Sequence, residues 1–222
     1  MRRRKLPVLA EIAGPVPGES RAWSLRSADL EALAGLRTTL AGRRVVLVCG
    51  AEALTGAVAL AGTTSAAGTR TALVECDLAR PRLAADLGLA AAPGLHEYLR
   101  WEATAPEILQ PLALAGPAAR AASAPLVCVA AGRPAPDPAR LIELESFRHA
   151  VAKLRGAYDL TVLIGPPLGV SSGPPETVAA QADAVLAAAS VKGLSGQSGR
   201  LLRAQLRDLR TEALGALAVG AE

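Results

Sequence analysis

The sequence predicts an α/β fold with a single doubly wound, mainly parallel sheet flanked by helices. Its length of 222 residues suits one domain built around one core. Several short apolar runs are continuous rather than alternating, which is typical of strands buried on both faces. Stretches with helical periodicity separate these runs, and strands that alternate with helices in this way form parallel sheets.

The expected elements follow from these patterns. Strands are predicted over residues 45–49, 71–76, 126–130, 160–164 and 184–189, with a closing strand at 216–219. Helices are predicted over residues 54–66, 80–87, 138–154, 175–182 and 201–214. Residues 27–40 read as an amphipathic helix that Ser27 caps. Residues 1–24 are expected to form an extended N-terminal arm, and residues 25–222 the α/β domain.

Composition excludes several classes of protein. Hydrophobic residues make up 51% of the chain and charged residues 20%, so a core can form and disorder of the whole chain is excluded. Aromatic residues make up only 2%, too few for a base-stacking surface. The cysteines are odd in number and widely spaced, so we expect neither disulfides nor a zinc site. They are Cys49, Cys76 and Cys128.

The sequence shows neither the pattern of a membrane span nor that of a signal peptide. No apolar window reaches the roughly 20 residues that a membrane span needs. The basic start of the chain lacks the apolar core of a signal peptide. We therefore expect a cytoplasmic, unprocessed protein in a reducing compartment.

In a doubly wound sheet, ligands bind beyond the carboxyl ends of the strands, so the residues after each strand are the candidates. Residues 49–56 (Cys-Gly-Ala-Glu-Ala-Leu-Thr-Gly) follow the first predicted strand. Residues 75–83 (Glu-Cys-Asp-Leu-Ala-Arg-Pro-Arg-Leu) follow the second. Residues 131–141 follow the third, and Gly165-Pro166-Pro167 follows the fourth.

In this order and spacing, these segments resemble the cytoplasmic ATPase domain of the bacterial tyrosine kinases of capsule and exopolysaccharide synthesis. Residues 75–82 are similar to the Asp-x-Asp-Leu-Arg-Arg-Pro motif of that family, and residues 132–142 to its Gly-x-x-Pro-Pro-Asn-Pro-x-Glu-Leu-Leu segment. Residues 93–99 are similar to its Pro-Gly-Leu-x-x-x-Leu turn, and residues 30–40 to its Glu-Ala-x-x-x-Leu-Arg-Thr-Asn-Leu helix. The resemblance spans about residues 6–219 and implies a P-loop-NTPase-like fold of the MinD and ParA type.

The chain departs from that family where nucleotide chemistry is done. A phosphate loop needs free backbone N–H groups, a lysine for the β/γ oxygens and a Ser or Thr hydroxyl for Mg²⁺. By the resemblance, the phosphate-loop positions are Gly50, Ala53 and Thr55, with Ala53 in place of the lysine. Lysine is absent from residues 6–152, so no other lysine on this side of the sheet replaces it. Glu52 would add a negative charge beside the triphosphate.

The acidic positions are only partly kept. Ile164 stands where the family has the aspartate that holds Mg²⁺, so this metal-binding position is lost. Glu75 and Asp77 keep two carboxylates after the second strand and are weak candidates for catalytic residues. The family's C-terminal tyrosine cluster is missing, and Tyr98 and Tyr158 are expected to be structural.

These departures imply a degenerate homologue, a regulatory or scaffolding pseudo-kinase that needs no cofactor or metal and lacks enzyme activity. By resemblance, it would act at the inner face of the membrane with a polysaccharide co-polymerase or chain-length protein. The alternative is an active tyrosine kinase or ATPase that binds ATP and Mg²⁺ through a remodelled loop, which the two acids Glu75 and Asp77 favour. A third possibility, an adaptor for polar localisation or pilus assembly, is disfavoured by residues 132–142.

Two surface patterns leave alternatives open. Glu31 and Arg37 match the family's Glu-x-x-Arg-x-x-Arg self-association helix, although Ala34 replaces the middle arginine. They form either a solvated face or an interface in a homo-oligomer or a hetero-oligomer with an active homologue. A row of arginines on one helix face, either solvated or suited to anionic lipid, comprises Arg200, Arg203, Arg207 and Arg210. Nucleic acid is not expected as a partner.

Overall fold

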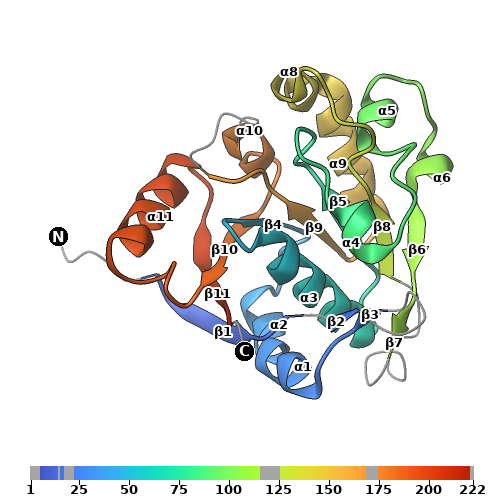
Figure 1. Ribbon diagram of the computed structural model, residues 1–222. Helices are drawn as coiled ribbons and strands as arrows, with labels where there is room; N and C mark the ends of the chain where they lie inside the picture. Colours follow the sequence, from blue (N-terminus) through green and yellow to red (C-terminus); the bar gives the residue numbers. More distant parts are fainter. Residues whose placement is uncertain (1–5, 15, 18–22, 116–125, 169–174, 221–222) are drawn as a thin grey trace.

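The computed structural model describes residues 6–14, 16–17, 23–115, 126–168 and 175–220 (Figure 1). An eight-stranded sheet dominates these residues, and every neighbouring pair in it is parallel except the last, which joins β8 and β6. The order across the sheet is β1 (Val8–Ile12), β11 (Ala213–Val219), β10 (Ala184–Ser190), β4 (Val45–Cys49), β9 (Leu160–Ile164), β5 (Thr71–Glu75), β8 (Leu126–Val129) and β6 (Gln110–Leu112). The predicted doubly wound α/β fold is confirmed.

Helices cover both faces of this sheet (Figure 1). One apolar cluster packs the sheet against α1 (Ser27–Ala34), α2 (Leu36–Thr39), α3 (Ala53–Ala66) and α4 (Leu83–Leu87). The other cluster involves α5 (Leu95–Leu99), α6 (Ala105–Ile108), α8 (Pro138–Glu143), α9 (Glu145–Ala157), α10 (Pro175–Ala179) and α11 (Gly196–Asp208). Within the described part of the chain, none of the helices is long and apolar enough to cross a bilayer.

Residues near the N-terminus also take part in sheets. Strand β1 lies within the segment expected to be an extended arm, and it forms the edge of the main sheet by pairing with β11. A second, three-stranded sheet joins β2 (Val16–Pro17), β3 (Trp23–Ser24) and β7 (Leu114–Ala115). Residues 8–12 are therefore tied to the last strand of the sheet in chain order, β11.

Several predicted boundaries are wrong. The helix expected over 80–87 begins only at Leu83, and the one expected over 138–154 breaks at Leu144, whose backbone is extended. The helix expected over 201–214 spans Gly196–Asp208, because strand β11 begins at Ala213 in register with β10. Ser27 is the first helical residue and not the cap, and the N-cap residue Arg26 makes no side-chain capping bond.

Helix α3 is nearly all buried, and its small residues allow it to lie close to the sheet. Its sequence is Ala-Leu-Thr-Gly-Ala-Val-Ala-Leu-Ala-Gly-Thr-Thr-Ser-Ala. A Cβ on Gly56 would lie 2.8 Å from the Cβ of Ala188 in β10, and a Cβ on Gly62 would lie 2.7 Å from Leu25. A larger side chain at Gly56 would push the start of α3 off the sheet, so glycine there is set by packing.

A matched pair of glycine substitutions tests this packing. We expect Gly56→Ala to lower the free energy of unfolding by about 1–3 kcal/mol because it overpacks the contact with Ala188. Gly35 has helical backbone angles and open space around its Cβ position, so Gly35→Ala is the control. The control is expected to raise stability by about 0.5–1 kcal/mol through helix propensity. Urea unfolding measures both, and equal effects of the two variants would contradict the packing argument.

Candidate functional site

The candidate site lies where parallel strands β4, β9, β5 and β8 end at the same edge of the sheet. Helix α3 begins at this edge, and the turns after β5 and β8 run along it. This arrangement brings most of the sequence-predicted site residues together. In a doubly wound sheet it is the expected ligand edge.

The turn from β4 to α3 is very short. Three residues, Gly50 to Glu52, separate Cys49 at the end of the strand from Ala53 at the start of the helix. Gly50 has a φ of 116°, and a Cβ there would collide with the carbonyl oxygen of Ala188. The Glu52 N–H donates a hydrogen bond to that same carbonyl, at 3.0 Å. The turn therefore rests on the backbone of β10, and one of its amides is already bonded within the chain.

The positions expected for lysine and for the Mg²⁺-binding aspartate are apolar and buried. Ala53 is 6% exposed and Ile164 is 4% exposed, and both belong to the apolar cluster on the α3 face of the sheet. Thr55 is half-buried, and its methyl group lies against Gly14, 2.7 Å from the point that a Cβ there would occupy. The three positions are thus built into packing contacts.

Glu75 is 2% exposed, and its carboxylate accepts hydrogen bonds from three backbone amides. One carboxylate oxygen accepts bonds from the N–H groups of Arg82 (2.6 Å) and Leu83 (2.9 Å) at the start of α4. The other oxygen accepts a bond from the N–H of Ala131, 3.2 Å away, just after β8. Glu75 therefore joins the turn before α4 to the end of β8, which is a structural task for a buried carboxylate.

Asp77 lies beside Glu75 but nearer to the surface. Its carboxylate accepts a hydrogen bond from the Arg80 N–H at 3.2 Å and lies 3.7 Å from the Arg80 guanidinium. The Arg82 guanidinium pairs instead with Asp86 in α4, at 3.1 Å. Asp77 and Arg80 thus form a local turn contact, and the Arg82 side chain faces away from it.

Burial is the largest influence on the pKa values of Glu75 and Asp77. It raises the pKa of Glu75 above its ordinary value of 4.5, although the three amide bonds act in the opposite direction, and the charge of Asp77 adds to the rise. Burial also raises the pKa of Asp77 above 3.8, against the effect of Arg80. Carboxylates with raised pKa values are common at functional sites and also in structural networks, so the hydrogen bonds decide the interpretation.

Glu97 is a third buried acid at this edge, and sequence reasoning missed it. It accepts hydrogen bonds from the N–H groups of Gly94 (2.9 Å) and Arg133 (3.2 Å). Burial raises its pKa, but these bonds outweigh burial and leave the pKa below its ordinary value. The signal that could have found it is the spacing of a capping box, with an acid three residues after the N-cap Gly94.

Among residues 6–14, 16–17, 23–115, 126–168 and 175–220, no cluster of three or more His, Cys, Asp or Glu side chains is placed to hold a metal ion. The thiols of Cys49, Cys76 and Cys128 are free and buried. Burial raises the pKa of Cys49 and Cys128 to about 12, so both stay protonated at neutral pH.

Comparison with known proteins places this architecture. A scan against protein-family models finds no match, and no curated protein matches the chain. The kinase domain of Escherichia coli tyrosine kinase ETK superposes with a TM-score of 0.77 at 18% identity, over 97% of this chain and 91% of that one. The BceF tyrosine kinase domain gives a TM-score of 0.75 at 19% identity, over 98% and 94% of the two chains. The chain has the fold of these tyrosine kinase domains.

A more distant match is a structure that was determined with Mg-ADP bound. The septum site-determining protein MinD from Pyrococcus horikoshii, complexed with Mg-ADP, gives a TM-score of 0.56 at 14% identity, over 78% of this chain and 68% of that one. The expected P-loop-NTPase-like fold of the MinD type is therefore confirmed. At such low identities the match establishes architecture, and the chemistry has to be argued from this chain's own residues.

Most of the predicted surface residues are exposed. Glu31 is on α1 and Arg37 on α2, and Gly35 between them keeps a helical backbone, so the two short helices form one exposed ridge. On α11, Arg200 and Arg207 are exposed and Arg203 is half-buried, whereas Arg210 is exposed in the turn beyond the end of the helix at Asp208. Leu202, Leu206 and Leu209 anchor this helix to the sheet. The predicted two-sided character is present in α11, but the prediction that Arg210 belongs to this helix face is wrong, because its φ of 57° lies in the left-handed region.

Unfolding measurements distinguish a structural role of Glu75 from a metal-binding role, because the two roles predict opposite effects of removing its side chain. We expect Glu75→Ala to lower the free energy of unfolding by about 3 kcal/mol, because it leaves three amides without their acceptor. Asp77→Ala, which removes a contact nearer the surface, is the matched control with a smaller effect. Both are measured by urea unfolding in metal-free buffer. If Glu75 were retained to bind a metal, its removal there would stabilise the protein by relieving a buried charge.

The raised pKa values of Glu75 and Asp77 predict a pH dependence. The folded protein holds protons on these groups that the unfolded chain has released, so stability declines as the pH rises from about 4.5 through the folded-state pKa values. Carboxylates with lowered pKa values, such as Asp183, contribute stability that is lost only at lower pH. We expect Glu75→Gln/Asp77→Asn to flatten the decline, measured by unfolding from pH 4.5 to 8. An unchanged slope would contradict this assignment.

Proposed function

We propose that this chain is a catalytically degenerate homologue of the polysaccharide-synthesis tyrosine kinases. It acts as a regulatory or scaffolding pseudo-kinase in capsule or exopolysaccharide polymerisation and export. The β4–α3 turn carries the proposal. Its Glu52 amide is bonded to the Ala188 carbonyl, and Ala53 stands where the phosphate-binding lysine is needed. A turn of three residues that rests on β10 leaves little backbone free to surround a triphosphate.

The energetic consequence of these changes is large. A lysine and a held Mg²⁺ neutralise charge on a phosphoryl group during its transfer, and together they stabilise the transition state by several kcal/mol. Each 1.36 kcal/mol corresponds to about tenfold in rate, so losing both lowers the rate by many orders of magnitude. The buried Ile164 offers no metal ligand in place of the aspartate.

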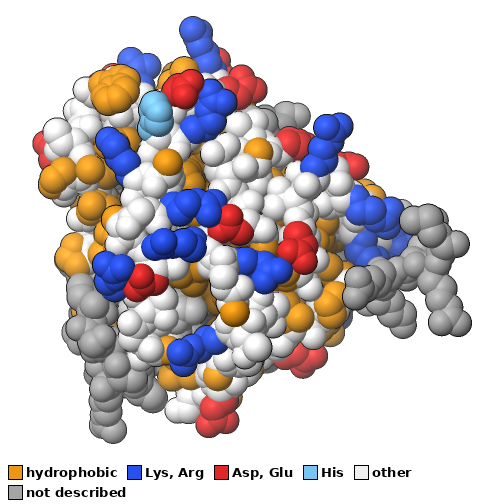
Figure 2. Space-filling view, turned by 180° about the vertical axis from the view of Figure 1, so that it is seen from behind, with side chains coloured by type: hydrophobic (Ala, Val, Ile, Leu, Met, Phe, Trp, Pro, Cys, Tyr) orange, Lys and Arg blue, Asp and Glu red, His pale blue; other side chains and the backbone are white. Residues whose placement is uncertain are grey.

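The proposed partner is the cytoplasmic tail of a membrane polysaccharide co-polymerase or chain-length protein, which would hold the chain at the inner face of the membrane. The proposed self-association surface is the ridge formed by α1 and α2, with Glu31 and Arg37, in a homo-oligomer or in a hetero-oligomer with an active homologue. Both assignments extend the resemblance and the shared fold. Nucleic acid fits poorly, because basic and acidic side chains are interspersed on the face shown in Figure 2.

The rival function is an active ATP-binding kinase or ATPase with a remodelled loop. One observation favours it: Glu75 and Asp77 remain together at the ligand edge, and their pKa values are raised. The hydrogen bonds of Glu75 to three amides account for its retention without catalysis. Asp77 is the residue on which the rival depends.

Nucleotide binding separates the two functions. We expect the thermal midpoint of the protein to be unchanged by millimolar Mg-ATP or Mg-ADP, and we expect no autophosphorylation. A ligand present at about a hundred times its Kd would add about 2.7 kcal/mol, a shift of several degrees for a chain of this size. Such a shift, lost in Asp77→Ala and kept in the control Asp86→Ala, would contradict the proposal and assign the rival function.

A further inference from the structure

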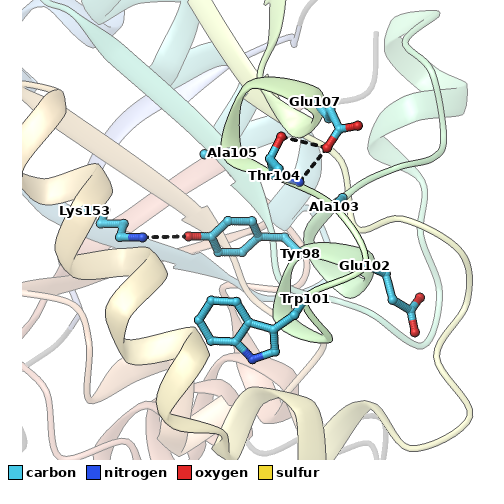
Figure 3. A pocket seen from close by; sticks show the side chains of 8 residues that line it. All are labelled: Tyr98, Trp101, Glu102, Ala103, Thr104, Ala105, Glu107 and Lys153. Carbon is cyan, nitrogen blue, oxygen red and sulfur yellow. Dashed lines mark hydrogen bonds between the residues drawn. The ribbon is translucent and has the colours of Figure 1, made fainter.

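An exposed aromatic notch lies on the face that carries α9, outside the candidate site (Figure 3). Its floor and walls come from α5 and the turn after it, from α6 and from one residue of α9. We define the notch by the residues that line it, which are Tyr98, Trp101, Glu102, Ala103, Thr104, Ala105, Glu107 and Lys153. The hollow has a volume of about 360 Å³. It is large enough for one or two side chains of a partner.

Trp101 occupies a backbone position that favours glycine. Its φ is 65°, in the left-handed region, and it follows Arg100, the C-cap of α5. The Trp101 N–H donates to the Tyr98 carbonyl (3.0 Å), and the Glu102 N–H donates to the Glu97 carbonyl (2.9 Å). This is the hydrogen-bond pattern of a Schellman motif, whose left-handed residue is usually glycine. A bulky side chain there is strained.

Packing does not explain this tryptophan. Trp101 is 78% exposed, in a chain where only 2% of the residues are aromatic. Figure 3 shows its ring beside that of Tyr98, both directed toward α9. Tryptophan and tyrosine in an exposed hollow are the residue types that most often dominate binding energy in protein interfaces. The strain and the exposure together indicate a side chain kept for an interaction.

The charge in the notch indicates what binds there. The Lys153 amine lies 3.3 Å from the Tyr98 hydroxyl and 6.0 Å from the centre of its ring, and no ion pair to Lys153 occurs within the described residues. Both glutamates are already engaged. Glu102 accepts a bond from Arg100, and Glu107 accepts two bonds from Thr104. Figure 3 shows their carboxylates turned away from the two rings. The ring side of the notch therefore presents apolar surface and one cation.

We propose that the notch binds a short acidic and apolar peptide segment of a partner protein. A bulky apolar side chain of the segment packs on Trp101 and Tyr98, and a carboxylate beside it pairs with Lys153. A neutral sugar fits less well because the carboxylates that would hold its hydroxyls face away. A nucleic acid fits less well because Lys153 is the one basic residue among the described residues that line the notch, whereas a phosphate backbone is bound by several cations. The notch shares no residue with the candidate nucleotide site, so this inference stands independently of the proposed function.

The test selects short randomised peptides displayed on phage against the immobilised full-length chain. We expect the recovered peptides to combine an Asp or Glu with a Leu, Phe or Trp. Each selected peptide, labelled with fluorescein, is then titrated with protein by fluorescence anisotropy. Lys153→Glu is expected to weaken binding about tenfold or more, as loss of a central contact does. The matched control Lys192→Glu, an exposed lysine on the β10–α11 turn, keeps the wild-type affinity.

A second variant separates binding from folding. Trp101→Gly relieves the left-handed strain, so it is expected to raise the thermal midpoint by about 2–4 °C while abolishing peptide binding. Each peptide is made with a free and with an amidated C-terminus. Comparing the two affinities shows whether Lys153 pairs with the terminal carboxylate or with a side-chain carboxylate. Recovery of no acidic and apolar peptide, or equal affinity for wild type, Lys153→Glu and Trp101→Gly, would overturn the proposal. Self-association of the free chain that Trp101→Gly abolishes would overturn it in favour of a second copy.

Discussion

The carboxylate of Glu75 accepts three backbone N–H groups, and the arrangement of the ligand edge depends on this contact. Two of the amides open α4 and the third follows β8, so one side chain sets the spacing between two segments that are far apart in sequence. Glu97 does the same for Gly94 and Arg133. A buried amide without an acceptor is costly in free energy. The two acids therefore hold these segments in position even when no ligand is bound.

The same reasoning links the edge to function. A phosphate loop binds nucleotide with amides that have no partner inside the protein, whereas the Glu52 amide here is bonded to Ala188. The lysine and aspartate positions, Ala53 and Ile164, contribute to the apolar core. The fold of the tyrosine kinase domains is thus kept, while the groups at its ligand edge are used to hold the edge together.

The sequence predicted the sheet well because buried parallel strands are continuous apolar runs, and β4 and β9 match their expected bounds. It predicted helix ends poorly. The start of α4 at Leu83 coincides with a hydrogen bond from the Leu83 N–H to Glu75, and the extended backbone at Leu144 was not predicted. The position of Glu75 and Asp77 at the sheet edge could be predicted, because both lie where a predicted strand ends. The hydrogen bonds of Glu75 could not be predicted, because its partner Ala131 is remote in sequence. Nothing local marked Trp101 as left-handed, because that position favours glycine.

Amide hydrogen exchange of the ligand edge tests the central claim most directly. The account predicts that the N–H groups of Glu52, Arg82, Leu83 and Ala131 are protected without any ligand, because each already donates to an acceptor in the chain. Their exchange rates should be unchanged by saturating Mg-ATP. Fast exchange of the Glu52 amide in the free protein, slowed on addition of Mg-ATP, would contradict the account, since it would show a loop that is open and awaits nucleotide.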